Sequence, residues 1–208
     1  MTQASDERAT HGNRQKHENP NPLQKQLIER FHRRVAALIK ETGAARLLDA
    51  GCGEGFGLRH LLKEGVTAVY VGSDISLEAL QWGRQNVLPG LPAAAADVHH
   101  LPYPNDTFPL VMCLEVLEHI PDSAVGLREL ARVSSEFVIF SVPHEPYFRG
   151  LNFLRGKHWS RWGNDPEHLH TYSGRALKRM AGRVPEIEVL GHEYSLPWQI
   201  ILARKTGV

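Results

Sequence analysis

The fold of this chain is decided by the stretch Leu47-Leu48-Asp49-Ala50-Gly51-Cys52-Gly53-Glu54-Gly55. Its apolar first half predicts a buried strand, and its glycines predict a tight turn that opens into a helix near Leu58. Glycine tolerates positive φ and lets backbone amides come close to a ligand, and the start of a helix adds a partial positive charge. The stretch therefore predicts a strand, a turn and a helix, with a ligand bound at the turn.

The spacing of the glycines separates this turn from two common nucleotide sites. A dinucleotide site normally has G-x-G-x-x-G, in which the third glycine lets the helix approach the pyrophosphate. Gly51, Gly53 and Gly55 instead form G-x-G-x-G, and the sequence lacks the G-x-x-x-x-G-K-[ST] pattern of a triphosphate loop. The turn therefore predicts a different ligand or, as the alternative, a tight loop that binds nothing.

Segments of strand and helix character alternate along the chain on both sides of this turn. The expected strands are Arg46–Ala50, Ala68–Ser73, Ala93–Ala96, Leu110–Leu114, Phe137–Val142, Glu186–Glu193 and Pro197–Arg204. The expected helices run from Pro22 to about Gly43, surround Leu58, and cover Leu77–Asn86, Ser123–Val133 and Ser173–Ala181. This alternation predicts an α/β fold with a doubly wound, seven-stranded, mostly parallel sheet.

The composition is that of one folded globular domain. The 208 residues are 42% hydrophobic and 23% charged, and 24 Lys and Arg against 23 Asp and Glu leave a formal net charge of +1. This balance argues against nucleic acid as a partner, because no general positive field attracts it. Cys52 and Cys113 fit no zinc or disulfide pattern. Neither a signal peptide nor a membrane-spanning run is recognisable, so we expect a cytoplasmic protein with no membrane contact.

Two segments depart from the alternating pattern. Residues 1–21 are polar and lack apolar periodicity, which predicts a flexible tail ahead of a single domain at 22–208. Residues 143–171, rich in Pro, Gly, Trp and His, predict an insert or lid over an acceptor site before the last helix and strands. The aromatic and histidine side chains in this segment and directly after it would either line that site or pack as an ordinary lid. They are Trp159, Trp162, His168, His170 and Tyr172.

Three further motifs follow the glycine turn, each at an expected strand. They are Val71-Gly72-Ser73-Asp74-Ile75-Ser76, then Ala96-Asp97-Val98 with Leu101-Pro102-Tyr103, then the run from Phe108 to His119. With the glycine turn, these motifs resemble the class I S-adenosylmethionine-dependent methyltransferases, specifically the small type-11 group, over about residues 40 to 145. One position departs from the family pattern, because Pro109 stands where the family usually has Asp. This departure leaves the hydrogen bonding at the start of that strand open.

The resemblance implies a Rossmann-like domain that binds S-adenosyl-L-methionine. The cofactor-binding residues it implies are Asp49, Gly51, Cys52, Gly53, Asp74, Ile75, Asp97, Val98, Leu114 and Glu115. In the family, the acid at Asp74 accepts hydrogen bonds from the ribose hydroxyls, and the acid at Asp97 accepts one from the adenine amine. The Val98 amide supports the ring, and Leu114 and Glu115 lie nearest the transferring methyl group. The structural alternatives are a helix N-terminal acid for Asp74 and a turn-forming side chain for Asp97.

The chemistry implied by the resemblance asks little of the protein. A sulfonium methyl group is already activated, so the enzyme must align a nucleophile in line with it and exclude water. His119 and His144 are the candidate catalytic bases for an acceptor that must lose a proton, because both follow expected strands. We expect methylation of a small-molecule acceptor, with oxygen as the first choice. The alternatives are an RNA methyltransferase and a non-catalytic regulatory protein that binds the cofactor without turnover.

A possible metal group lies in the fourth motif. Glu115, Glu118 and His119 would share one face if the segment were helical, and with His168 or His170 they would offer ligands to a divalent cation. The alternative is a solvated, salt-bridged helix start. No fixed spacing to a second histidine supports a site, so we assign no metal ligand.

Overall fold

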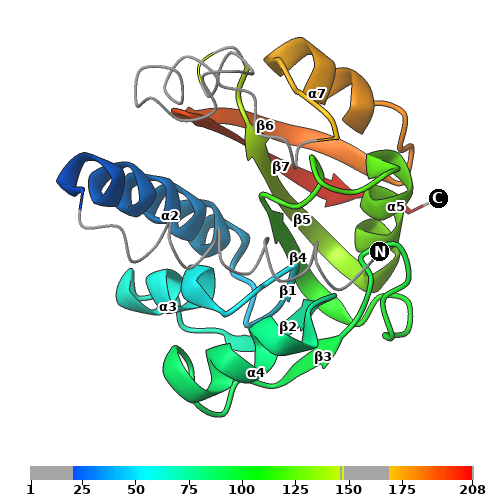
Figure 1. The fold of residues 1–208 in the computed structure, drawn as a ribbon. Helices are drawn as coiled ribbons and strands as arrows, with labels where there is room; N and C mark the ends of the chain where they lie inside the picture. Colours follow the sequence, from blue (N-terminus) through cyan, green and yellow to red (C-terminus); the bar gives the residue numbers. More distant parts are fainter. Residues whose placement is uncertain (1–20, 146, 148–168, 208) are drawn as a thin grey trace.

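A seven-stranded sheet forms the centre of the molecule (Figure 1), and the computed structural model describes residues 21–145, 147 and 169–207. The strands are β1 (Arg46–Ala50), β2 (Val69–Asp74), β3 (Ala93–Ala95), β4 (Phe108–Leu114), β5 (Ser134–Pro143), β6 (Ile187–Ser195) and β7 (Trp198–Lys205). Their order is β3-β2-β1-β4-β5-β7-β6. β7 pairs antiparallel with both β5 and β6, and the pairs from β3 to β5 are parallel. The expected doubly wound, mostly parallel fold is confirmed.

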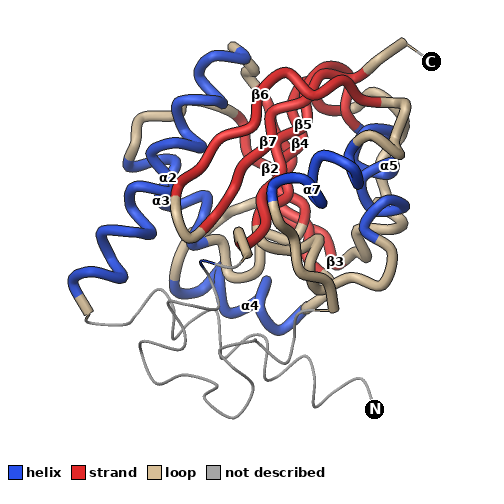
Figure 2. The backbone as a smooth tube through the Cα atoms, turned by 90° about the horizontal axis from the view of Figure 1, so that it is seen from above, coloured by secondary structure: helices blue, strands red, loops and turns tan. Residues whose placement is uncertain are grey.

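Helices cover both faces of this sheet. They are α2 (Pro22–Thr42), α3 (Phe56–Lys63), α4 (Leu77–Asn86), α5 (Ser123–Val133) and α7 (Gly174–Ala181). Figures 1 and 2 show α2 and α3 on one side of the sheet and α5 and α7 on the other. The strand order reverses between β1 and β4, so the carboxyl ends of these two strands frame the crevice in which open α/β sheets bind ligands.

The alternation of side chains along each strand divides the apolar core in two. In β1, Leu47 packs into the core beneath α2 and α3, whereas Leu48 packs into the core beneath α5 and α7. The same division separates Met112 from Cys113 in β4. Both faces are buried because helices cover both, which is why these strands read as continuous apolar runs in the sequence.

The first described helix is capped at both ends, close to its expected bounds. Pro22 occupies the first turn, and Asn21 Oδ1 accepts the Leu23 amide at 3.0 Å. Gly43 ends the helix with φ of 66°, a left-handed conformation that glycine adopts at low cost. These caps hold α2 to the expected bounds.

The strand pair β4–β5 differs from the sequence prediction at its start. β5 begins at Ser134, directly after α5, rather than at Phe137, and β4 begins at Phe108 rather than at Leu110. The register of the pair shifts between Phe108 and Leu110, around Pro109, which has no amide hydrogen to donate to the ladder. The irregular start of β4 therefore coincides with the one departure from the family pattern.

Most of the two segments set apart in the sequence lies outside the described residues. The predicted tail falls there except for Asn21, and so does the predicted insert except for 143–145, 147 and 169–171. Among the helices that the structure describes, none has the length and hydropathy needed to cross a membrane.

Candidate functional site

The glycine turn after β1 is held by hydrogen bonds to the end of β2. The amides of Gly51 and Cys52 both donate to the Ser73 carbonyl, at 2.7 and 2.9 Å. The Gly53 amide donates to Asp74 Oδ2 at 2.7 Å. Gly51 has φ of 86°, a conformation that other residues rarely adopt. The turn is therefore fixed at the carboxyl edge of the sheet, where the sequence predicts a ligand.

Asp74 links this turn to the start of α4. Its second carboxylate oxygen, Oδ1, accepts the Ser76 amide at 2.9 Å, and Ser76 Oγ in turn accepts the Ala79 amide at 3.1 Å as the N-cap of α4. The next side chain, Ile75, is apolar yet 66% exposed. Asp74 thus makes the helix-start contact of the structural alternative, and its role toward ribose stays a prediction.

Close packing surrounds the glycine turn on three sides. A Cβ added at Gly51 would overlap the side chain of Val116, in the loop after β4. A Cβ at Gly83, in α4, would overlap the backbone of Glu54. Cys52 is buried, and its Sγ lies close to where a Cβ would stand at Gly72 in β2. Glycine is needed here for close approach as well as for backbone conformation.

Asp49 is buried at the end of β1. It is only 4% exposed, and burial, followed by the negative charge of Asp74, raises the pKa of its carboxyl to about 8. The carboxyl is therefore mostly protonated at neutral pH, and a positively charged ligand beside it would favour the ionised form.

Asp97 and Val98 follow β3 at the same edge. Directly before them, the Ala96 amide donates a hydrogen bond to the Asp74 carbonyl at 2.9 Å. Asp97 Oδ1 accepts both the amide and the ring Nδ1 of His99, each at 2.8 Å. Val98 is buried in the core beneath α5. Asp97 therefore forms the local turn contact that was the structural alternative, while its side chain stays 47% exposed.

Leu114 and Glu115 leave β4 beside the glycine turn, because β4 is the neighbour of β1. Glu115 has φ of 61°, which is uncommon for a residue with a side chain. Its Oε1 accepts the hydroxyl of Ser141 in β5 at 3.1 Å. The backbone turns sharply at Glu115, and the side chain is tied to the next strand.

The helical premise of the possible metal group is wrong. Residues 115–120 form bends and turns, so Glu115, Glu118 and His119 do not share a helix face. Glu118 is buried, and His119 Nε2 lies 3.9 Å from its Oε1. Within the described part of the chain, no three His, Cys, Asp or Glu side chains gather as they would around a metal ion. His168 lies outside that part.

The two candidate bases have different surroundings. The side chain of His119 is about one-third exposed on the turn after β4. His144 follows β5, its amide donates to the Pro197 carbonyl at 2.8 Å, and burial lowers the pKa of its ring. The two histidines lie on different loops, His119 after β4 and His144 after β5, so they are separate candidates.

Aromatic rings surround His144. The rings of Tyr147 and Tyr194 lie with centroids 5.3 and 5.1 Å from it, and both tyrosines are half exposed. His192 lies 4.7 Å from Tyr194 and hydrogen-bonds Gln199 Oε1 at 3.1 Å. β5 ends and β7 begins at the same edge of the sheet, so this cluster stands beside the loops that follow β4.

Of the aromatic and histidine residues predicted to form a lid or line the acceptor site, two lie among the described residues and three do not. Tyr172 is buried, and its hydroxyl lies 2.7 Å from Ser123 Oγ at the start of α5. His170 Nε2 lies 3.1 Å from the Pro121 carbonyl. Both therefore pack against the α5 end of the sheet. Trp159, Trp162 and His168 lie outside the described residues.

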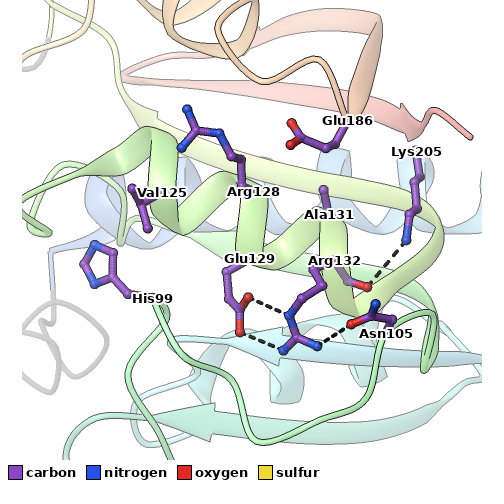
Figure 3. A pocket seen from close by; sticks show the side chains of 9 residues that line it. All are labelled: His99, Asn105, Val125, Arg128, Glu129, Ala131, Arg132, Glu186 and Lys205. Carbon is purple, nitrogen blue, oxygen red and sulfur yellow. Dashed lines mark hydrogen bonds and ion pairs between the residues drawn. The ribbon is translucent and has the colours of Figure 1, made fainter. Parts of the chain in front are cut away.

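A separate hollow of about 370 Å³ runs along α5 (Figure 3). Arg132 crosses it, with its guanidinium on the Glu129 carboxylate at 2.7 Å and on Asn105 Oδ1 at 2.8 Å. Lys205 contacts Asp106 and the carbonyl of Arg132. Arg132 and Glu129 are thus paired with each other inside the hollow, and none of the predicted cofactor residues lines it.

Comparison with known proteins identifies the family. The family profile described as "Methyltransferase domain" matches residues 23–184. The chain belongs to the class I S-adenosylmethionine-dependent methyltransferases. The predicted family is thus confirmed, while the narrower type-11 group and the individual site residues stay predictions.

Two relatives and one structure indicate the range of this similarity. Malonyl-[acyl-carrier protein] O-methyltransferase of Halorhodospira halophila is 31% identical over 156 residues, which are 74% of this chain and 51% of the relative. Fatty-acid O-methyltransferase of Mycolicibacterium smegmatis is 30% identical over 112 residues, covering 53% and 40%. The chain thus spans about half the length of such relatives or less. Magnesium protoporphyrin IX methyltransferase from Synechocystis PCC 6803, with bound SAH, shares the fold at a TM-score of 0.67, with 20% identity over 89% of this chain and 88% of that one.

Sequence reasoning missed the contact residues of the site. His99, Val116 and Ser141 each touch a predicted cofactor residue or the glycine turn. The spacing of His99 two places after Asp97 is a recognisable signal, because aspartate often accepts bonds from a residue two positions on. The contacts of Val116 and Ser141 depend on neighbouring strands and have no local signal.

Proposed function

We propose that this chain binds S-adenosyl-L-methionine across the carboxyl ends of β1, β2 and β4 and transfers its methyl group to a small-molecule acceptor. The observation that carries the proposal is the position of the glycine turn, which follows β1 at the point where the strand order reverses. The Gly53 amide of this turn donates to Asp74 Oδ2 at 2.7 Å. Membership of the methyltransferase family and the position of the turn at the carboxyl edge of the sheet both support S-adenosyl-L-methionine as the ligand.

The residues present suit the parts of this cofactor. Asp74 and Asp97 offer carboxylate acceptors for a ribose diol and an adenine amine. Ile75, which directly follows Asp74, offers an exposed apolar side chain. Asp49, buried beside the turn, favours a cationic group. When bound, the sulfonium supplies an activated methyl group. The protein then has to hold the acceptor in line and keep water away.

We propose an oxygen acceptor, in particular a carboxylic acid. The two relatives described above are named for malonyl and fatty-acid substrates, and both names denote carboxylic acids. A carboxylate is ionised at neutral pH, so it attacks without a base. The half-exposed rings of Tyr147 and Tyr194 give the acceptor side an apolar surface for the rest of such a molecule.

We propose His144 as the first candidate base for an acceptor that carries a proton, such as a phenol. Its pKa is lowered by burial, so the ring is neutral at physiological pH and able to accept a proton. His119 is the second candidate. For a carboxylate acceptor, His144→Ala should leave the pH profile of kcat unchanged, whereas for a phenol it should remove the acidic limb.

The first experiment is calorimetric titration of the purified protein with S-adenosylmethionine, S-adenosylhomocysteine and NAD in parallel. Micromolar binding of the first two alone supports the cofactor proposal. A screen of methyl-group transfer to fatty acids, dicarboxylic monothioesters and phenols then tests the acceptor. Binding of NAD alone, or of none of the three, would overturn the proposal. Cofactor binding without transfer to any acceptor would instead favour the regulatory alternative.

A further inference from the structure

The ring of His99 bridges two parts of the fold that border the predicted adenine site. Its Nδ1 lies 2.8 Å from Asp97 Oδ1, and its Nε2 lies 3.2 Å from the backbone carbonyl of Asp122. Asp97 follows β3, whereas Asp122 is the N-cap of α5 and accepts the amides of Ala124 and Val125. One side chain thus joins the loop after β3 to the start of α5.

This bridge constrains one oxygen of Asp97. The side chain of His99 is 15% exposed, whereas that of Asp97 is 47% exposed. Oδ1 accepts both the amide and the ring of His99, while Oδ2 accepts no hydrogen bond from the described residues. Partial burial raises the pKa of Asp97, but the two hydrogen bonds from His99, together with the charges of His99 and His100, outweigh it and lower the pKa overall, so the side chain is an anion at neutral pH.

We propose that His99 is a positioning residue for adenine recognition: it fixes the Asp97 carboxylate through Oδ1 and leaves Oδ2 to accept the 6-amino group. The proposal rests on the proposed function, because it needs adenine at Asp97. An aspartate on a loop would otherwise lose rotational freedom when the ligand binds, and a side chain that is already held avoids this cost. The Asp122 carbonyl and Asp97 Oδ1 are both acceptors, so the imidazole is anchored to both when each of its nitrogens carries a hydrogen.

The test compares two ligands that differ at one position of the base. S-adenosylhomocysteine carries the 6-amino group, and S-inosylhomocysteine carries a carbonyl there, which cannot donate to a carboxylate. Calorimetry gives both dissociation constants and hence a discrimination ratio. His99→Ala should weaken S-adenosylhomocysteine binding by roughly threefold to tenfold, because the Asp97 side chain must then be ordered when the ligand binds. Binding of the inosyl ligand should hardly change, so the ratio should fall.

Two further variants make the result specific. His99→Asn places an amide donor where the ring Nδ1 stood and cannot reach Asp122, so it should restore most of the ratio. His100→Ala removes the neighbouring exposed histidine and should leave the ratio unchanged. Equal weakening of both ligands in His99→Ala, or an unchanged ratio, would overturn the role of His99 alone. If the wild-type protein bound neither ligand, the proposed function would fail and this inference with it.

Discussion

The Asp74 carboxylate accepts the Gly53 amide at 2.7 Å, so the acid predicted to bind ribose also holds the glycine turn. Its other oxygen accepts the Ser76 amide at the start of α4. One side chain therefore orders both backbone segments that border the predicted cofactor site. Loss of affinity in an Asp74 variant would combine a missing ligand contact with a loosened turn.

Asp74→Ala should weaken S-adenosylmethionine binding by about 1.5–3 kcal/mol for each charge-assisted bond lost, and should also lower Tm. Asp74→Asn keeps an acceptor oxygen and should lose less of both. Calorimetry and thermal unfolding measure the two effects. Glu188→Gln, an exposed change on β6, is the control and should alter neither. Wild-type affinity in Asp74→Ala would remove this residue from the site.

Gly51→Ala should lower the free energy of unfolding by about 2–5 kcal/mol. Positive φ costs an alanine about 1–2 kcal/mol, and the added Cβ overlaps Val116. Gly90→Ala is the matched control, because Gly90 has φ of 82° but open space around it. It should show the conformational cost alone. Denaturant unfolding of both variants measures the difference, and equal losses would mean that the overlap with Val116 is relieved at no cost.

Asp49→Asn should flatten the pH dependence of stability between about pH 4 and 8. The folded carboxyl keeps its proton until a pKa of about 8, whereas the unfolded chain releases it near pH 4. Folding therefore takes up a proton in this window, and the free energy of unfolding falls as pH rises, by at most about 1.4 kcal/mol per pH unit. Urea unfolding at several pH values gives the slope. An identical slope in wild type and variant would show that Asp49 ionises normally in the fold.

Tyr172→Phe should destabilise the protein by about 1–2 kcal/mol. The Ser123 hydroxyl donates to the Leu117 carbonyl, so the Tyr172 hydroxyl is the donor in its contact with Ser123, and this buried bond is lost in the variant. Tyr194→Phe removes a hydroxyl from a half-exposed ring and should change stability by less than about 0.5 kcal/mol. Similar losses in the two variants, measured by chemical unfolding, would contradict the role of the buried pair.

The sequence predicts the architecture well because the deciding signals are local. The apolar run ending at Ala50 and the glycines that follow specify a strand and a turn within one short stretch, and α2 carries its own caps. Strand ends were less predictable. β5 starts at Ser134 because it pairs with β4 there, and nothing near Ser134 reports the position of that partner.

The site could be predicted in outline but not in its contacts. The positions of Asp74 and Asp97 follow from strand ends, whereas the positive φ of Glu115 and its bond to Ser141 depend on how β4 and β5 align. The same turn removes the helix on which the possible metal group depended. Spacing along the chain describes a shared face only when the secondary structure is already known.

The insertion of β7 between β5 and β6 has a consequence for the chain as it emerges from the ribosome. β5 is synthesised well before β7, so a nascent chain presents β5 with one edge of unpaired amides and carbonyls beside buried-type side chains such as Ile139 and Phe140. Such an edge is prone to pair with other chains or to be bound by chaperones. When β7 arrives, the exposed edge on this side of the sheet becomes β6, where the exposed charge of Glu188 disfavours pairing with another chain.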